Sequence, residues 1–210
     1  MQNFKQYFKN EYCPSFKRWA SKYSTIKEVW DNCPRADWLL WLLEKIGNSD
    51  NVILFAACDM IESVLHLVSD DHPKKTIEIV KLYLGGQATE TEVIVACDSL
   101  NPNNILFTYF AGETAANIVA KGVINLTQAC MTHIISVNYH AQRIVSYVYK
   151  AFYLTDTYIS TDIKSIIQRK LEIHKKFAGI LRKRIPWKCV ENRIKNAKSK
   201  NISRKFQCLL

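Results

Sequence analysis

The sequence lacks any apolar run approaching the roughly 20 residues that a helix needs to cross a bilayer. Its dense apolar stretches, such as Trp38 to Leu43, are far shorter, so no membrane span is expected. The first twelve residues alternate charged and aromatic side chains and do not have the apolar core of a secretory signal. We therefore expect a cytoplasmic protein.

The seven cysteines include no Cys-x-x-Cys pair and no Cys/His spacing typical of a zinc ligand set. Their number is odd and they are widely spaced, which favours reduced, mostly buried thiols over a disulfide framework. A structural zinc site is the alternative, and the missing paired spacing disfavours it. No other cofactor is indicated.

Strand patterns are also scarce, because period-two alternation and hairpin turns are absent. The β-branched runs Val93 to Val95 and Ile134-Ile135 leave strands as the weaker alternative. Apolar residues instead recur at three- and four-residue steps, the spacing of one helix face. The sequence predicts an all-α, multi-helix bundle.

Charge is unevenly distributed along the chain. The net charge is +10, yet residues 1–163 hold 14 Lys/Arg and 17 Asp/Glu, whereas residues 164–210 hold 15 Lys/Arg and only 2 Asp/Glu. We predict a helical bundle over residues 1–155 and a basic C-terminal helical extension and tail over residues 156–210.

The stretch from Trp30 to Leu43, with three tryptophans and four leucines, is predicted to be the centre of the core. An aromatic face upstream predicts a helix over about 3–22, kinked or split at Pro14. Start and stop signals divide the next part: capping boxes at Thr25/Glu28 and Thr89/Glu92, and proline or glycine at helix ends. These signals predict helices over about 25–30, 33–46, 50–69, 73–84 and 89–98.

The second half is rich in small residues, which let helix axes approach closely. Two helices are expected there, over about 102–121 and 123–153, although Gly122 alternatively bends a single long helix. An amphipathic helix is predicted over 161–184, where Pro186 ends it. A short basic helix over about 187–198 and a tail follow.

Residues 25–152 resemble the immunity-protein-five-like family of bacterial toxin systems and phage genomes. The matching signatures are Trp30-x-x-Cys33-x-Arg35-x-Asp37-Trp38-Leu39-x-Trp41-Leu42-Leu43 and Asp71-His72-Pro73-Lys74-Lys75-Thr76-Ile77-Glu78, followed by Leu82, Tyr83, Leu84 and Gly86. The resemblance implies an all-helical fold without assigned catalytic activity. His72 stands where the family pattern has arginine, and the basic end lies outside the resemblance, so a shared fold would not transfer a partner.

The basic end is the most informative chemical feature. Its cations are spaced to follow helix faces and a tail, with aromatics among them for stacking on bases. An acidic protein surface, a membrane surface or a merely solvated helix are the alternatives. The candidate polyanion-binding residues are Arg169, Lys170, Lys175, Lys176, Arg182, Lys183, Arg184, Trp187, Lys188, Arg193, Lys195, Lys198, Lys200, Arg204, Lys205 and Phe206.

Four further groups of residues have simpler explanations than a functional site. Trp30, Trp38 and Trp41 can in principle hold a ligand between aromatic walls, but their helical spacing favours core packing. Arg35 and Asp37 can form a site pair or simply be the polar side of a first turn. A metal or general-base cluster can be drawn from Glu62, His66, Asp71 and His72, but no nucleophile lies at a recognisable spacing, and His133 and His140 read as buried histidines.

The sequence thus favours a non-enzymatic binding or inhibitory protein, of the immunity or phage counter-defence (anti-CRISPR-like) type. Its expected partner is a protein target within a nucleic-acid-bound defence or nuclease complex, whose RNA or DNA the basic end contacts. The alternatives are a direct, sequence-independent nucleic-acid-binding protein and a metal-dependent hydrolase built on the cluster at Glu62. No catalytic or metal-binding residue is assigned.

Overall fold

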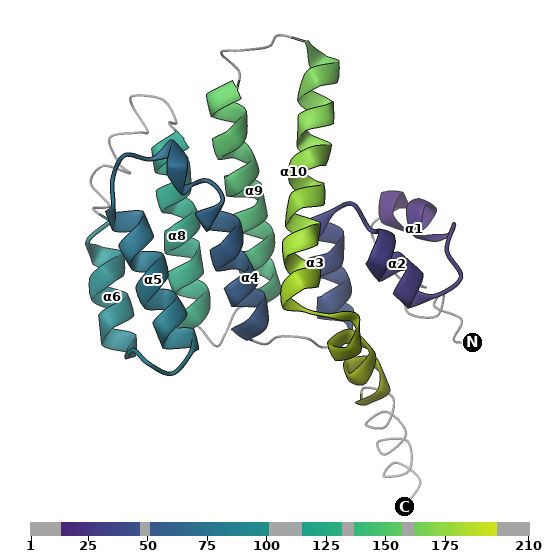
Figure 1. Ribbon diagram of the computed structural model, residues 1–210, viewed down its shortest axis with the longest axis horizontal. Helices are drawn as coiled ribbons and strands as arrows, with labels where there is room; N and C mark the ends of the chain where they lie inside the picture. The colour runs from purple at the N-terminus through teal and green to yellow at the C-terminus, as the bar shows by residue number, and fades with distance from the viewer. Residues whose placement is uncertain (1–13, 47–50, 101–114, 132–136, 157–161, 197–210) are drawn as a thin grey trace, which may run out of the picture.

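The computed structural model describes residues 14–46, 51–100, 115–131, 137–156 and 162–196 (Figure 1). Every regular element within these ranges is helical, which confirms the predicted all-α bundle. The α-helices are α1 (Pro14–Ala20), α2 (Ile26–Asn32), α3 (Ala36–Lys45), α4 (Asn51–Glu62), α5 (His72–Leu84), α6 (Glu90–Asp98), α8 (Ala115–Met131), α9 (Val137–Asp156) and α10 (Ile163–Arg184), with a 3-10 helix η2 (Leu65–Leu67). Residues 187–196 are also helical.

Both predicted capping boxes are present. Thr25 Oγ1 accepts the amide hydrogen of Glu28 at 3.1 Å, while the Glu28 carboxylate accepts that of Thr25 at 2.9 Å. Thr89 and Glu92 repeat the arrangement at the start of α6. Each box satisfies amide groups that a helix start otherwise leaves unpaired, so the sequence locates these starts to the residue.

Two predicted helix boundaries are wrong. Pro34 is predicted in the first turn of α3, but α3 begins at Ala36, because Arg35 has extended backbone and is the N-cap residue. Cys33 has that conformation and ends α2. The helix predicted to reach residue 69 stops at Glu62, where Val64 N–H donates to the Ile61 carbonyl at 3.0 Å and tightens the last turn.

Gly122 does not separate two helices, contrary to one prediction. It lies inside α8, where a Cβ would sit 3.8 Å from Cβ of Tyr147 on α9 and 3.9 Å from the Ile61 side chain on α4. These are ordinary van der Waals distances, so Gly122 lies where α8 meets both helices but a Cβ would fit there. Residues 102–114 of the predicted helix lie outside the described ranges, as do residues 3–13 of the N-terminal one.

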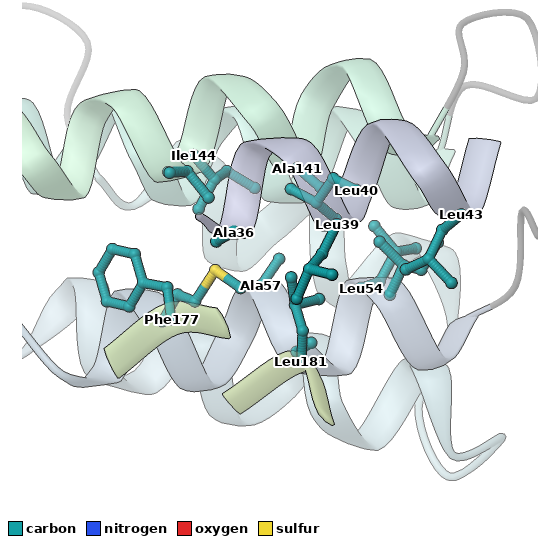
Figure 2. Packing of buried hydrophobic residues seen from close by; sticks show 14 of the residues in the cluster. Ala36, Leu39, Leu40, Leu43, Leu54, Ala57, Ala141, Ile144, Phe177 and Leu181 are labelled. Atoms are coloured by element: carbon teal, nitrogen blue, oxygen red, sulfur yellow. The ribbon is translucent and has the colours of Figure 1, made fainter. Parts of the chain in front are cut away.

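Helix α3 contributes its leucines to the hydrophobic core, but the most central helix is α4, which packs against α5, α8, α9 and α10, so the prediction that the segment Trp30 to Leu43 is the centre of the core is only partly right. Figure 2 shows the leucines of α3, including Leu39 and Leu40, pointing at side chains from three other helices. These are Leu54 and Ala57 of α4, Ala141 and Ile144 of α9, and Phe177 and Leu181 of α10. All of them are at most 3% exposed, so burial of this cluster is a main source of stability.

The helices are arranged around this cluster in a fixed order. Helix α8 pairs extensively with α9, α5 and α6 lie on one side, and α3 and α10 lie on the other, with α1 and α2 beyond them (Figure 1). Helix α10 thus runs along the bundle, and its apolar side belongs to the same core as α3 and α4. The basic C-terminal part is joined to the body through this helix.

The cysteines within the described ranges form no disulfide. Cys33, Cys58 and Cys130 are buried, Cys97 is half-buried and Cys189 is exposed. Burial raises the pKa of the Cys33 and Cys130 thiols to about 12, so both stay protonated at neutral pH. None of the described helices has the length and apolar character needed to span a membrane.

Candidate nucleic-acid interface

The outer side of α10 carries most of the predicted binding residues that the structure describes. Asp162 caps the helix by accepting the amide hydrogens of Lys164 and Ser165, each at 3.2 Å. From there an apolar side turns inward, with Phe177 and Leu181 fully buried. The opposite side is exposed over its whole length, as an amphipathic helix requires.

This outer side is rich in positive charge. Arg169, Lys176 and Lys183 are seven residues apart and so lie in one row, and Lys175 lies beside them. Glu172 is the one acid of α10, and it accepts a hydrogen bond from Gln168 at 3.0 Å. Over residues 162–196 there are 11 Lys/Arg and 3 Asp/Glu, so this surface attracts anions.

The helical segment 187–196 continues the basic surface past Pro186. Lys188 is exposed and Arg193 half-buried. Lys195 forms an ion pair with Glu191 at 3.2 Å. Trp187, expected to stack on bases, is half-buried against the core. It lines a hollow of about 190 Å³ with Thr25, Ile26, Lys27, Glu191, Ile194 and Lys195, so the segment docks against α2.

Two of the predicted binding residues instead contact the protein body. Arg182 donates from Nε to the Trp30 carbonyl at 2.8 Å and from its terminal nitrogen to the Cys33 carbonyl. Those carbonyls lie at the C-terminal end of α2, where a helix leaves acceptors unpaired and favours a cation. Arg182 thus caps α2 from a position about 150 residues further along the chain.

Arg184 binds the carboxylate of Asp59 on α4 through two hydrogen bonds, at 2.6 and 2.8 Å. Partial burial by itself would raise the pKa of Asp59, but the hydrogen bonds and charge of Arg184, and then of Lys81, outweigh it and hold that pKa below its usual value. Lys81 also pairs with Glu62 at 2.6 Å. This four-residue network ties α10 to α4 and α5.

The residues of the hydrolase alternative do not form a ligand set. Glu62 is engaged by Lys81, and the His72 ring lies 2.6 Å from Asp70. Across the described ranges, no group of three or more His, Cys, Asp or Glu is placed to hold a metal ion. The side chains of His133 and His140 lie outside the described residues, as do Lys198, Lys200, Arg204, Lys205 and Phe206.

An aromatic pocket lies next to α10. It has a volume of about 280 Å³ and is formed by α1, α3 and α9, with Ser15, Phe16, Arg35, Asp37, Trp38, Trp41 and Gln142 as lining residues. Trp30 is buried, as predicted for all three tryptophans, but Trp38 and Trp41 are only half-buried and border this pocket. The helical spacing predicts their shared face and does not predict the opening.

A polar cluster forms the floor beside these rings. Arg35 donates to Asp37 through Nε at 3.0 Å and a terminal nitrogen at 2.6 Å, and its guanidinium lies 4.6 Å from the Trp38 ring centre. Behind Asp37, His174 of α10 is 7% exposed, and its Nδ1 has no hydrogen-bond partner among the described residues. The nearest carboxylate oxygen, on Asp37, is 3.7 Å away.

The surroundings of His174 disfavour its charged form. Burial lowers its pKa below the usual value, Asp37 opposes that effect, and the positive charges of Arg35 and Lys170 add to it. Its ring stacks on Tyr149 of α9, with centroids 6.5 Å apart, and the Lys170 ammonium lies 4.8 Å from the Tyr149 ring centre. The pocket therefore adjoins α10 where His174 approaches Asp37.

Comparison of the chain with known proteins gave no match to a family model, a curated protein or a solved structure.

Proposed function

We propose that the protein is a non-enzymatic binding protein that acts on a nucleic-acid-bound protein complex and contacts its RNA or DNA through α10 and residues 187–196. The observation that carries the proposal is the outer side of α10. There, exposed cations follow a helix face for 22 residues with a single acid among them. Such a surface suits a phosphate backbone, which offers regularly repeated negative charge without a fixed sequence.

The internal pairing of Arg182 and Arg184 strengthens this proposal. These two arginines have partners in the body, whereas Lys175, Lys183 and Lys188 have no ion-pair partner among the described residues. The C-terminal segment thus has two kinds of cation: arginines that bind the protein body and lysines that face solvent. Solvent-facing lysines give up little when they meet phosphate, because no internal ion pair has to break.

A role in inhibiting or modulating the target rests on the resemblance to immunity proteins. That resemblance implies an all-helical scaffold without catalysis, and the helical fold agrees with it. The helices of the body would contact protein while α10 meets nucleic acid. A defence or toxin nuclease complex, which holds both components, fits such a divided surface.

The test compares two variants with the same change in net charge. Lys175, Lys183 and Lys188 are changed together to glutamine, and Lys22, Lys74 and Lys75, exposed on the body, are changed in the control. Binding to a single-stranded oligonucleotide of about 12 nucleotides is measured between about 50 and 200 mM salt. The first variant should lower the slope of log affinity against log salt by about 2, and the control by much less.

Equal slopes for the two variants would contradict the assigned interface. Direct binding without a protein target is the second candidate, and the same basic row favours it. A pull-down with and without nuclease separates the two. A complex led by protein contacts survives nuclease treatment, whereas a complex held only through phosphates dissociates.

A further inference from the structure

The pocket between α1, α3 and α9 has the chemistry of a site for one nucleotide unit. Its walls are aromatic, since Phe16, Trp38 and Trp41 all line it. Phe16 meets both indoles edge-on, with centroid distances of 5.4 and 4.9 Å, and this contact holds the indole rings in place. At about 280 Å³ the pocket is at the small end of ligand sites, so it suits a single planar ring and little more.

The charge around the pocket excludes a cation as the natural occupant. Asp37 is the one acid in the lining, and Arg35 already binds it with two hydrogen bonds. Lys170 adds a second positive charge near His174. A cage for a quaternary ammonium needs electron-rich rings without competing cations, whereas this cluster has a positive balance.

The start of α3 lies at the same place and already carries an acid in its first turn. Arg35 is the N-cap residue of this ten-residue helix, and no side chain there accepts a hydrogen bond from the first amide groups. Asp37 lies in that first turn, where the helix dipole favours its negative charge, so the phosphate of a bound nucleotide is expected outside this helix start. The buried, unpartnered Nδ1 of His174 lies next to Asp37 in the same cluster, an independent sign that its polar groups are not fully satisfied within the described residues.

The pocket also has a group able to read a base edge. Gln142 of α9 lines it, and its carboxamide makes no hydrogen bond within the described part of the chain. A carboxamide both donates and accepts, as the edge of every nucleobase does. Stacking on the aromatic walls with edge contacts to Gln142 would hold a base, and the cations of α10 would meet the phosphates of its strand.

We propose that this pocket captures one unstacked base of a single-stranded nucleic acid whose backbone follows α10. The inference rests on the proposed function and narrows it, because a duplex keeps its bases stacked and has none to insert. Helix α10 passes the pocket at His174, 3.7 Å from Asp37, and Lys170 lies about one turn earlier on that helix, so a strand leaving the pocket would meet the cations of α10. Single-strand binding proteins combine a cationic path and aromatic stacking in this way.

The experiment uses the full chain and three probes of about 12 units: oligo-dT, oligo-rU and an abasic deoxyribose-phosphate strand. Since stacking of a base on an aromatic side chain contributes about 1–3 kcal/mol, the base-containing probes should bind at least about 5-fold more tightly than the abasic one. A preference between oligo-dT and oligo-rU identifies DNA or RNA as the source of the base.

Two variants test whether the difference in affinity between base-containing and abasic probes arises at the pocket. Trp38→Leu should remove most of it, and Gln142→Ala, which leaves the core intact, should reduce it about 3-fold, with abasic binding unchanged in both. Tyr83→Leu, at a half-buried ring on α5 outside the pocket lining and the basic segment, is the control and should keep the preference for bases.

Equal binding of base-containing and abasic probes by the unaltered protein would overturn the pocket proposal and leave the backbone contact of α10 standing. Equal loss for all probes in Gln142→Ala would also overturn it. If no probe binds at about 50 mM salt, the proposed function itself fails.

Discussion

Arg182 and Lys183 are neighbours on α10 and face opposite environments. The Arg182 guanidinium is half-buried and donates to the backbone carbonyls of Trp30 and Cys33, whereas the Lys183 side chain is exposed to solvent. Adjacent helix positions lie about 100° apart around the axis, which places one cation against α2 and the other on the outer basic row.

Replacing each of these two residues by methionine should therefore give opposite results. Arg182→Met leaves carbonyls at the end of α2 without their donor, and we expect a loss of about 2 kcal/mol in unfolding free energy with little change in oligonucleotide affinity. Lys183→Met should keep stability within about 0.5 kcal/mol and weaken binding. Urea denaturation and oligonucleotide titration measure the two effects. A large loss of affinity in correctly folded Arg182→Met would contradict the division of roles.

The Arg184–Asp59 pair should contribute to stability in a pH-dependent way. A double-mutant cycle with Arg184→Gln and Asp59→Asn should give a coupling of about 1 kcal/mol at pH 7, a small value because Arg184 is 41% exposed. The folded pKa of Asp59 is lowered. The coupling is therefore full above the unfolded pKa of about 3.9 and is lost as pH falls through the folded value. A coupling that persists after Asp59 is protonated would refute this account.

Gly179 should be replaceable with a gain in stability. It is exposed in the middle of α10, and nothing lies within 4 Å of the position of an added Cβ. Gly179→Ala is expected to raise the unfolding free energy by about 0.5–1 kcal/mol by lowering the entropy of the unfolded chain. Gly86→Ala is the contrasting control. Gly86 has φ +74° and its replacement should destabilise by about 1 kcal/mol. Thermal and urea unfolding would show whether the signs differ.

His174 should make the protein less stable in mild acid. Its folded pKa is lowered by burial, so below the ordinary value of about 6.5 the unfolded chain binds a proton that the folded chain does not. The unfolding free energy should fall as pH drops through 6.5 and level off below the folded pKa. His174→Gln removes this titration, so the variant should lose less stability than wild type between about pH 7.5 and 5.5. If urea denaturation shows equal losses of unfolding free energy in the variant and in the wild type, His174 is not the cause of the acid sensitivity.

Local signals in the sequence located several elements well. Thr25 with Glu28 and Thr89 with Glu92 mark helix starts because each cap is made by residues three apart. The outer row of α10 could also be predicted, because helical periodicity depends only on the spacing of residues along the chain. The prediction that Gly122 is a helix boundary is wrong because glycine often ends helices, whereas this glycine lies inside α8 near Ile61 and Tyr147, neighbours that the sequence does not reveal.

Long-range pairing could not be predicted. Arg182 and Arg184 look like every other cation of the basic end, and their partners lie more than 120 residues earlier in the chain. The spacing of Trp38 and Trp41 likewise does not predict the aromatic pocket. Whether an indole is covered depends on how α1 and α9 are placed against α3, and that placement results from the whole core.

The shared core of α3, α4 and α10 has a practical consequence for deletion experiments. Cutting the chain near Asp162 would remove Phe177 and Leu181 together with the lysines, leaving the surfaces of Leu39 and Ala57 open to water. Such a fragment would aggregate or melt before any question about charge is answered. The cations of the outer row can be removed by substituting exposed residues one at a time. They cannot be removed by deleting α10, because the core needs the apolar side of that helix.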